Sequence, residues 1–295
     1  MLRQLCCAVL GLCAAGFAVA EGLTGRPASY TVQPGDTLLD VARRFDVGYA
    51  GIRAANPQFD PWVPPVDEPL LLPTQHIVPA GAVKGILINV AELRLYYFMP
   101  DGSAVLSFPL GIGREGWQTP LGGTRVARKV VHPVWVPTPS ERTENPDLPA
   151  SVAPGPDNPM GDYALYLARR GYAIHGTNRP FSIGRRDSHG CIRLYPEDIA
   201  RLYALAGVGT PVTVVDQPVK LGWQDGELYL EVHAGQAGAD ALEQGLEPPS
   251  PAQDVVDAMV RGAAGAEVER VNWDTVHLTA QQMRGMPVQV TARRN

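Results

Sequence analysis

The first clear pattern of hydrophobic positions along the chain predicts a helix over residues 38–45. Apolar side chains recur there at spacings of three and four residues, which places them on one helical face. Pro34-Gly35 is typical of a turn, and Asp36 or Thr37 can cap the helix that follows. The residues of the apolar face are Leu38, Val41, Ala42 and Phe45.

Short elements flank this helix. Residues 30–32 and residues 70–72 have the character of short strands. A second helix is predicted over residues 49–56. It should end at Asn56, because the next residue is a proline and a helix usually ends at such a position. The order strand, helix, helix, strand predicts a very small folded unit over residues 29–74.

Beyond a linker at about residues 75–83, the pattern changes to short β-branched and aromatic runs separated by glycine turns. Asp101-Gly102 is a hairpin signal between two of these runs. One clear helix is expected at residues 196–206. These features predict a mainly β domain, of the α+β class, over residues 84–215. The expected strands are residues 85–91, 93–98, 104–110, 124–131, 163–168 and 212–215.

Residues 132–160 interrupt this regular pattern with eight prolines in 29 residues. A connection this long and irregular is uncommon in a compact domain unless it serves a function. We expect a loop that covers the functional site, and an inert surface excursion is the alternative.

The last part of the chain, residues 216–295, predicts a small α+β extension. Alternating polarity over residues 227–233 predicts a strand, and residues 252–262 are predicted as a helix. Residues 272–278 and 287–292 are predicted as strands. No catalytic pattern is visible in this extension, so the sequence assigns it no role.

The N-terminus has the pattern of a secretory signal peptide. Arg3 precedes an apolar run over residues 5–17, and Ala18-Val19-Ala20 offers a small-residue cleavage site. The run is too short for a comfortable membrane span. We therefore expect residues 1–20 to be removed on export, with an uncleaved anchor as the alternative.

Three of the four cysteines lie in that signal segment, so the mature chain would keep only Cys191. It would have no partner for an internal disulfide, and an unpaired thiol in an exported protein needs an explanation. A small buried apolar residue is one explanation. A nucleophile is the one we favour, because Gly190 precedes Cys191 and His189 lies two residues before it.

Composition and charge narrow the function classes. The formal net charge of −5 argues against a nucleic-acid binder. Residues 114–201 hold 12 basic and 9 acidic side chains, whereas residues 216–295 hold 6 basic and 12 acidic ones. The basic excess favours an anionic substrate, and a solvated face is the alternative. The arginines nearest to the cysteine are Arg179, Arg185, Arg186 and Arg193.

A thiol becomes a strong nucleophile when a neighbouring histidine takes its proton. Either His175 or His189 could do so. A backbone carbonyl beside Gly176 could orient the His175 ring, and N–H groups of the loop at Gly190 could hold an oxyanion. Acyl transfer through a thioester fits these parts. The six histidines show no zinc-type spacing, so neither a metal nor another cofactor is expected.

The small N-terminal unit carries a recognisable set of residues: Tyr30-Thr31-Val32, Pro34-Gly35-Asp36-Thr37-Leu38, Ala42, Phe45, Asn56-Pro57 and Leu72-Pro73. With them, residues 29–74 resemble a LysM module. That family binds glycans that contain N-acetylglucosamine, so the resemblance implies a tether to peptidoglycan. A structural adaptor without sugar affinity is the alternative. The long proline-rich connection between Asn56 and Leu70 departs from the family pattern.

The cysteine domain carries a second set: His175-Gly176-Thr177, Ser188-His189-Gly190-Cys191-Ile192-Arg193, Gly111-Ile112-Gly113, Thr119-Pro120-Leu121-Gly122 and residues 155–161. With these motifs, residues 84–215 resemble the YkuD-type catalytic domain of the L,D-transpeptidases. The resemblance implies a β-sandwich fold. The wider layout is similar to the periplasmic group of Gram-negative bacteria, which attaches murein lipoprotein to peptidoglycan or makes 3–3 crosslinks.

The resemblance also implies roles for single residues. Cys191 would be the acylated nucleophile, and His175 would be the general base, oriented by the carbonyl of Gly176. His189 would shape the site, while Gly190 and Cys191 would offer N–H groups to an oxyanion. The implied substrate-binding positions are Ser188, Arg193, Thr177 and Asn178.

The implied reaction cleaves a tetrapeptide stem after its third residue, diaminopimelate, and releases D-alanine. The acyl group passes to an amine of a lipoprotein lysine or of another stem, in the periplasm, and carbapenems are the implied inhibitors. An L,D-carboxypeptidase or a lipoprotein-detaching hydrolase with the same thioester is the alternative. A non-catalytic wall-binding protein is a further one, which the intact His175 and Cys191 disfavour.

Overall fold

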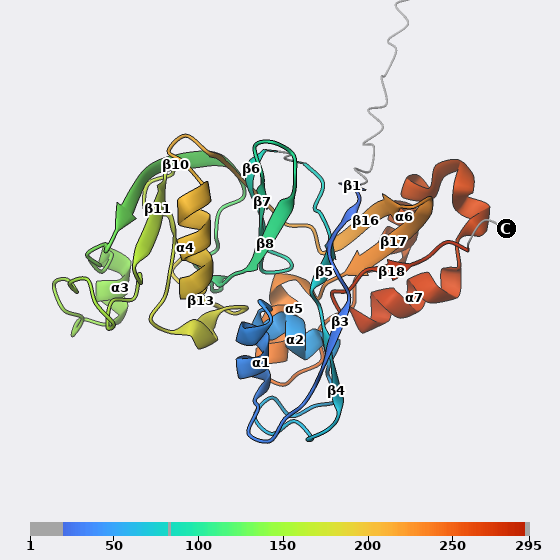
Figure 1. The fold of residues 1–295 in the computed structure, drawn as a ribbon, viewed down its shortest axis with the longest axis horizontal. Helices are drawn as coiled ribbons and strands as arrows, with labels where there is room; N and C mark the ends of the chain where they lie inside the picture. The colour runs from blue at the N-terminus through green and yellow to red at the C-terminus, as the bar shows by residue number, and fades with distance from the viewer. Residues whose placement is uncertain (1–19, 82–83, 293–295) are drawn as a thin grey trace, which may run out of the picture.

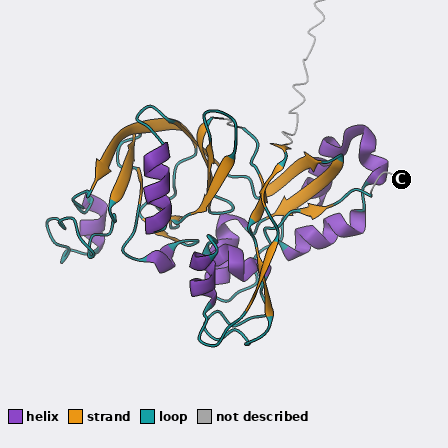
Figure 2. Cartoon of the chain, in the orientation of Figure 1, coloured by secondary structure: helices purple, strands orange, loops and turns teal. Residues whose placement is uncertain are grey.

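The computed structural model describes residues 20–81 and 84–292, and its elements form three parts (Figure 1). A small N-terminal unit, in blue, lies at the bottom of the view beside a large sheet in green and yellow, and the orange and red C-terminal part lies to the right. Figure 2 shows that short helices are distributed among all three parts. The predicted signal peptide, residues 1–20, falls outside the described residues except for Ala20.

The N-terminal unit has the predicted order of strand, helix, helix and strand. Thr37 caps the first helix, because its side chain accepts a hydrogen bond from the Asp40 N–H. Leu38, Val41 and Ala42 are buried as predicted and belong to one small core. The elements are β3 (Ala28–Thr31), α1 (Leu38–Arg44), α2 (Tyr49–Ala55) and β4 (Pro69–Leu72).

The predicted linker is partly a strand. β5 (Gln75–Ile77) pairs antiparallel with β2 (Leu23–Gly25), which precedes the N-terminal unit. The chain therefore enters and leaves this unit along one two-stranded ribbon. Paired strands satisfy each other's backbone groups, which a free linker would leave to water.

Eight strands form the large sheet: β6 (Gly85–Asn89), β7 (Arg94–Phe98), β8 (Val105–Pro109), β10 (Gly122–Val131), β11 (Tyr163–Leu167), β12 (Ala173–His175), β14 (Ile192–Arg193) and β15 (Pro211–Val215). Their order is β14-β12-β11-β10-β15-β6-β7-β8. The pairs β12–β14 and β15–β6 are parallel, and the other pairs are antiparallel. The predicted mainly β, α+β class is confirmed, and the predicted β-sandwich takes the form of one large curled sheet.

Smaller elements complete this part. α4 (Pro196–Leu205) matches the predicted helix and packs against β11 (Figure 1). A two-stranded parallel sheet, β9 (Ile112–Gly113) with β13 (Arg186–Ser188), lies beside the main sheet, after the short 3-10 helix η1 (Pro180–Ser182). Asp101-Gly102 lies in the turn between the antiparallel strands β7 and β8, as predicted.

We call residues 132–160 the covering loop. It contains one short helix, α3 (Pro139–Glu144), which starts with a capping box between Thr138 and Glu141. Asn158 is fully buried, and its side-chain amide donates to three backbone carbonyls of the loop. The loop is therefore an ordered structure held by its own hydrogen bonds.

The C-terminal part has its own hydrophobic core. Its sheet contains β1 (Ala20–Glu21), β16 (Val219–Gln224), β17 (Glu227–Val232) and β18 (Val288–Gln289). Its helices are α5 (Gly235–Glu243), α6 (Gln253–Ala264), α7 (Trp273–Gln282) and the 3-10 helix η2 (Gly265–Arg270). β17 and α6 correspond to the predicted strand and helix.

One prediction for this part is wrong, because residues 272–278 form the start of α7 and not a strand. The Asn272 side chain accepts a hydrogen bond from the Thr275 N–H and caps the helix. Val276 and Ala280, four residues apart, are both buried against the core. A cap followed by helical spacing therefore outweighed the β-branched composition of the segment.

The C-terminal part packs against both other parts. α5 contacts α2 of the N-terminal unit and β13 beside the large sheet. Arg185 forms an ion pair with Glu243, and Arg186 forms one with Asp240, so two helix carboxylates meet two arginines of the cysteine segment. Part of the acidic excess of the extension thus pairs with part of the basic excess around the cysteine.

The N-terminal unit also docks directly on the cysteine segment. The N–H groups of Tyr49 and Ala50, at the start of α2, donate to the carbonyls of Ile183 and Gly184. A Cβ atom placed on Gly48 would lie 2.8 Å from the Gly184 Cα, so the two backbones can approach this closely only because both residues are glycine.

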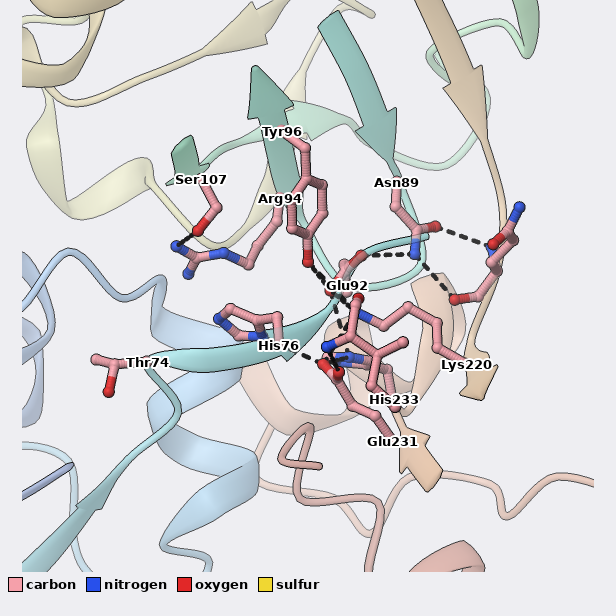
Figure 3. Close-up of polar contacts among 12 residues, drawn as sticks. Thr74, His76, Asn89, Glu92, Arg94, Tyr96, Ser107, Lys220, Glu231 and His233 are labelled. Atoms are coloured by element: carbon pink, nitrogen blue, oxygen red, sulfur yellow. Dashed lines mark hydrogen bonds and ion pairs between the residues drawn. The ribbon is translucent and has the colours of Figure 1, made fainter. Parts of the chain in front are cut away.

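Buried charged side chains join the three parts (Figure 3). The Lys220 ammonium donates to the Glu92 carboxylate at 2.6 Å and forms an ion pair with Glu231 at 3.0 Å. His76 and His233 each lie within 3.1 Å of Glu231. We call these five residues the junction cluster. They come from β5, the turn between β6 and β7, β16, β17 and the residue after β17, so the cluster ties distant segments together.

Candidate active site

The pairing of β12 with β14 brings the predicted catalytic residues together. The two strands are parallel, with Ile174 opposite Ile192 and His175 opposite Arg193. Side chains alternate along a strand, and Cys191 directly precedes β14, so His175, Arg193 and Cys191 share one face of the sheet. Ile174 and Ile192 point to the other face and are fully buried in the core.

His175 is buried and held in one orientation. Its Nδ1 lies 2.7 Å from the Gly176 carbonyl oxygen, so Nδ1 carries the proton and donates it to this bond. Burial lowers the pKa of His175 to about 4, and the charge of Arg193 contributes to the same effect. The imidazole is therefore neutral at neutral pH, and its Nε2 is free of a proton.

Cys191 is partly exposed, with its Sγ 3.7 Å from the Gly171 carbonyl oxygen. Burial raises the pKa of the thiol. A backbone hydrogen bond with Ala173 and the charge of Arg193 act in the opposite direction, and the charge of Glu141 raises the pKa further. The thiol is thus protonated in this environment, and the imidazole on the same face of the sheet is neutral.

Two hydroxyl groups hold the loop before the cysteine, and one of them is that of Thr119, which donates to the Gly190 carbonyl at 3.0 Å. Ser188 is buried, and its Oγ donates to the Cys191 carbonyl at 2.7 Å and accepts from the Gly190 N–H at 3.1 Å. Gly190 has φ +102°, and a Cβ there would lie 2.8 Å from a ring carbon of Tyr172. Because the Gly190 N–H is engaged, Cys191 carries the backbone N–H that an oxyanion could use.

Two functions are predicted for Arg193: a positive charge near the cysteine and a contact with the substrate. Its Nη1 forms an ion pair with Asp187 at 2.8 Å, and its side chain is 20% exposed. Its backbone exchanges hydrogen bonds with Gly111, which belongs to a motif noted in the sequence. The segment at residues 111–113 is therefore held by backbone hydrogen bonds to the strand that follows Cys191.

The covering loop contacts the site through His189. The Glu144 carboxylate accepts from His189 Nε2 at 2.8 Å and forms an ion pair with Arg114. The Trp117 ring lies 5.1 Å from the His189 ring. The second acidic residue of α3, Glu141, has its Oε1 3.7 Å from His189 Nδ1. His189 is thus engaged by the covering loop.

Sequence reasoning missed the partners of His189. Arg114, Glu141 and Glu144 carry no motif, and the unusual proline content of the covering loop was the only signal that pointed toward them. Trp117 lies between two quoted glycine motifs but was not singled out.

The remaining predicted site residues differ in burial. Thr177 is buried, and its hydroxyl accepts from the Arg179 N–H at 2.9 Å. Asn178 is exposed and donates to the Asp157 carbonyl, which links it to the covering loop. Of the arginines near the cysteine, Arg185 and Arg186 are paired with α5. Arg193 is paired with Asp187, and its charge acts on the thiol.

Three residues of the junction cluster could supply metal ligands, although their spacing in the sequence gave no sign of this. Ligand atoms of His76, Glu92 and Glu231 lie within 4.8 Å of one another. The Lys220 ammonium forms ion pairs with both carboxylates, so it supplies the positive charge that such a group of ligand atoms attracts.

Across residues 20–81 and 84–292, no helix combines the length and the apolar character that a membrane crossing requires.

Comparisons with known proteins identify two domains in the chain. Residues 84–214 match the L,D-transpeptidase catalytic domain (YkuD), and residues 30–73 match the LysM domain. The chain is 40% identical over 281 residues to ErfK/SrfK of Escherichia coli, described as a probable L,D-transpeptidase, covering 93% of this chain and 87% of that one. It is 41% identical over 255 residues to YbiS of Escherichia coli, also described as a probable L,D-transpeptidase, covering 81% and 83%.

A more distant relative is YkuD of Bacillus subtilis, described as a putative L,D-transpeptidase, at 28% identity over 63% of this chain and 98% of that one. The extent of similarity to the Escherichia coli proteins, together with the matched catalytic and LysM domains, establishes the family. The chain belongs to the L,D-transpeptidase family of enzymes and carries a LysM domain.

Proposed function

We propose that the chain is a peptidoglycan L,D-transpeptidase that works through a thioester on Cys191. The observation that supports this most is the register of β12 and β14, which puts Cys191 and His175 on one face of the sheet. The Gly176 carbonyl fixes Nδ1–H, so Nε2 is the basic nitrogen. A thiol and a positioned neutral imidazole are the parts that nucleophilic acyl transfer needs.

In the first half of the reaction, His175 takes the proton of Cys191. The thiolate then forms a C–S bond to the carbonyl carbon of the third stem residue. The developing oxyanion accepts a hydrogen bond from the Cys191 N–H, and the positive charge of Arg193 supports the anionic sulfur. The C–N bond breaks, His175 returns the proton to the leaving amine, and D-alanine departs.

In the second half, an amine attacks the thioester, and the thiol is restored as an amide forms. The amine belongs to a lipoprotein C-terminal lysine or to another stem. If water attacks in its place, the same site is an L,D-carboxypeptidase or a lipoprotein-detaching hydrolase. The thioester is common to both outcomes, so the acceptor alone decides between them.

The partners and the location follow from the domains. The LysM module at residues 29–74 binds the glycan, the stem peptide occupies the site between the covering loop and Arg193, and carbapenems acylate Cys191. Thr177 and Asn178 line the stem, while Ser188 positions the cysteine loop. The signal peptide predicted for residues 1–20 sends the chain to the periplasm. The catalytic domain occupies residues 84–215.

Mass spectrometry tests the proposal most directly. The purified chain is mixed with disaccharide-tetrapeptide, with and without a peptide that ends in the lipoprotein lysine. We expect a thioester adduct on the wild type and no adduct on Cys191→Ala, which should still bind glycan. A normal adduct yield on Cys191→Ala would remove the nucleophile assignment, and bare tripeptide as the only product would favour the hydrolase.

The base is tested separately. His175→Ala should slow alkylation of Cys191 near neutral pH by about 10²-fold or more, because the thiol loses its proton acceptor. His189→Ala serves as the comparison and should change the alkylation rate much less. If the two variants behaved in the opposite way, His189 would be the base.

A further inference from the structure

A carboxylate that the proposed mechanism does not use lies close to His189, two residues before the nucleophile. Glu141 belongs to α3 of the covering loop, and its Oε1 faces His189 Nδ1 at 3.7 Å. His189 is two residues from Cys191, and the charge of Glu141 acts on the thiol itself. The Glu141 side chain is 18% exposed, so a ligand can reach it.

The two oxygens of Glu141 differ in their bonding. Oε2 accepts from the N–H and the hydroxyl of Thr138, at 2.7 and 2.9 Å, and so closes the capping box of α3. Oε1 faces His189 at a distance beyond hydrogen-bond range. An ionised carboxylate has about four acceptor positions. Oε1 therefore keeps the capacity to accept hydrogen bonds on the side that faces His189.

The position of this charge is unfavourable for the first half of the reaction. A negative charge near Cys191 opposes ionisation of the thiol. The neighbouring Glu144 is neutralised by Arg114, whereas Glu141 has no such arginine partner among the ion pairs of the described residues. The Glu141 carboxylate would instead favour a later step, in which a positively charged group has to bind at the site.

We propose that Glu141 binds the acceptor, and that its Oε1 holds the ammonium group of a primary amine beside the thioester on Cys191. The inference rests on the proposed function and adds the recognition of the acceptor to it. The ammonium group belongs to a lysine side chain or to a diaminopimelate side chain, which share this chemistry. Glu141 attracts and orients the group, and His175 receives its proton.

The second half of the reaction then balances. The ammonium gives one proton to His175 and becomes a neutral amine. Its nitrogen forms a C–N bond to the thioester carbonyl carbon while the C–S bond breaks, and the sulfur of Cys191 leaves with the electron pair. The sulfur takes up one proton, the new amide nitrogen loses another, and one proton in total passes to the solvent.

Glu141→Gln tests the proposal, because glutamine at this position keeps the capping box and removes only the charge. The acyl-enzyme is formed from tetrapeptide stem, and its transfer is followed against increasing acceptor concentration. One acceptor is a lysine-terminated peptide, one is a diaminopimelate-containing tripeptide stem, and the third is hydroxylamine, a neutral nucleophile. Asp147→Asn, an exposed acid in the same loop, is the matched control.

We expect Glu141→Gln to raise the half-saturating concentration of the charged acceptor about tenfold, the loss typical of one charge-assisted hydrogen bond. Acylation should not slow, because the variant removes a charge that opposes ionisation of the thiol. Transfer to hydroxylamine should stay within about twofold of the wild type, as should every rate of Asp147→Asn. The charged acceptor that shows the larger shift identifies the physiological amine as lysine or diaminopimelate.

Two results would overturn the proposal. An unchanged response to both charged acceptors would show that Glu141 does not hold the ammonium group. An equal loss with hydroxylamine would show a general effect on the site. If the wild type formed no acyl-enzyme from the tetrapeptide, the proposed function would fall together with this inference, whereas normal acylation with either of the first two results removes the inference alone.

Discussion

Two clusters of charged side chains in this molecule use the same residue types in opposite settings. In the junction cluster, the side chains of Lys220, Glu92 and Glu231 are at most 1% exposed (Figure 3). At the active site, Arg114 and Glu144 are each 40% exposed. Charges in the junction have no water to replace a lost partner, so they hold the three parts together. Charges at the site can exchange partners with solvent or substrate.

The two buried histidines sharpen the comparison. Burial lowers the pKa of both His76 and His175 to about 4. The two histidines are therefore similarly buried, but His175 shares a face of the sheet with Cys191, whereas His76 contacts the Glu231 carboxylate at 3.1 Å. A perturbed histidine marks a candidate active site only when a reactive group stands beside it.

The largest effect is expected when the junction cluster loses its cation. Lys220→Met leaves two buried carboxylates without their ammonium partner and should lower the free energy of unfolding by about 3–5 kcal/mol. Urea denaturation measures the change. Lys84→Met, at an exposed lysine, should change it by less than about 0.5 kcal/mol. A loss below about 1 kcal/mol for Lys220→Met would mean that the cluster does not stabilise the junction.

Acid should weaken the molecule through the same residues. An unfolded histidine binds a proton with a pKa near 6.5, whereas folded His76 and His175 bind one only near pH 4. The free energy of unfolding therefore has its full value above about pH 6.5. It decreases as the pH falls toward about 4, by up to about 3 kcal/mol for each histidine.

His76→Gln should flatten this fall, because one of the two linked protons is removed. Urea denaturation at several pH values measures the slope for the variant and for the wild type. His132→Gln, at a histidine whose side chain is 63% exposed, is the control and should keep the wild-type slope. An unchanged slope for His76→Gln would contradict the assignment of a neutral buried His76.

The smallest effect on stability is expected at the active site. Glu144→Gln removes an ion pair with Arg114 and the charge that faces His189, yet both partners are partly exposed, so the free energy of unfolding should change by less than about 1 kcal/mol. Acyl transfer should slow severalfold, because α3 loses a contact that places the covering loop. A loss of several kcal/mol would make the two clusters equivalent.

The sequence determined the local elements and the family of this protein. Thr37 ahead of a 3.6-residue repeat is enough to place α1, since caps and helical faces depend on near neighbours. The motifs around His175 and Cys191 identified the L,D-transpeptidase domain. The segment at residues 272–278 was misassigned because composition favoured a strand, while the cap on Asn272 and burial at helical spacing favoured a helix.

Contacts between distant segments were decided only by the tertiary structure. Glu144 lies 45 residues from His189, and Glu231 lies 155 residues from His76, so neither pair leaves a periodic signal in the chain. Parallel pairing put Cys191 and His175 on one face of the sheet, and packing of α5 supplied the partners of Arg185 and Arg186. Local preference depends on neighbours along the chain, whereas burial, and with it the pKa of a histidine, depends on which distant segments exclude water.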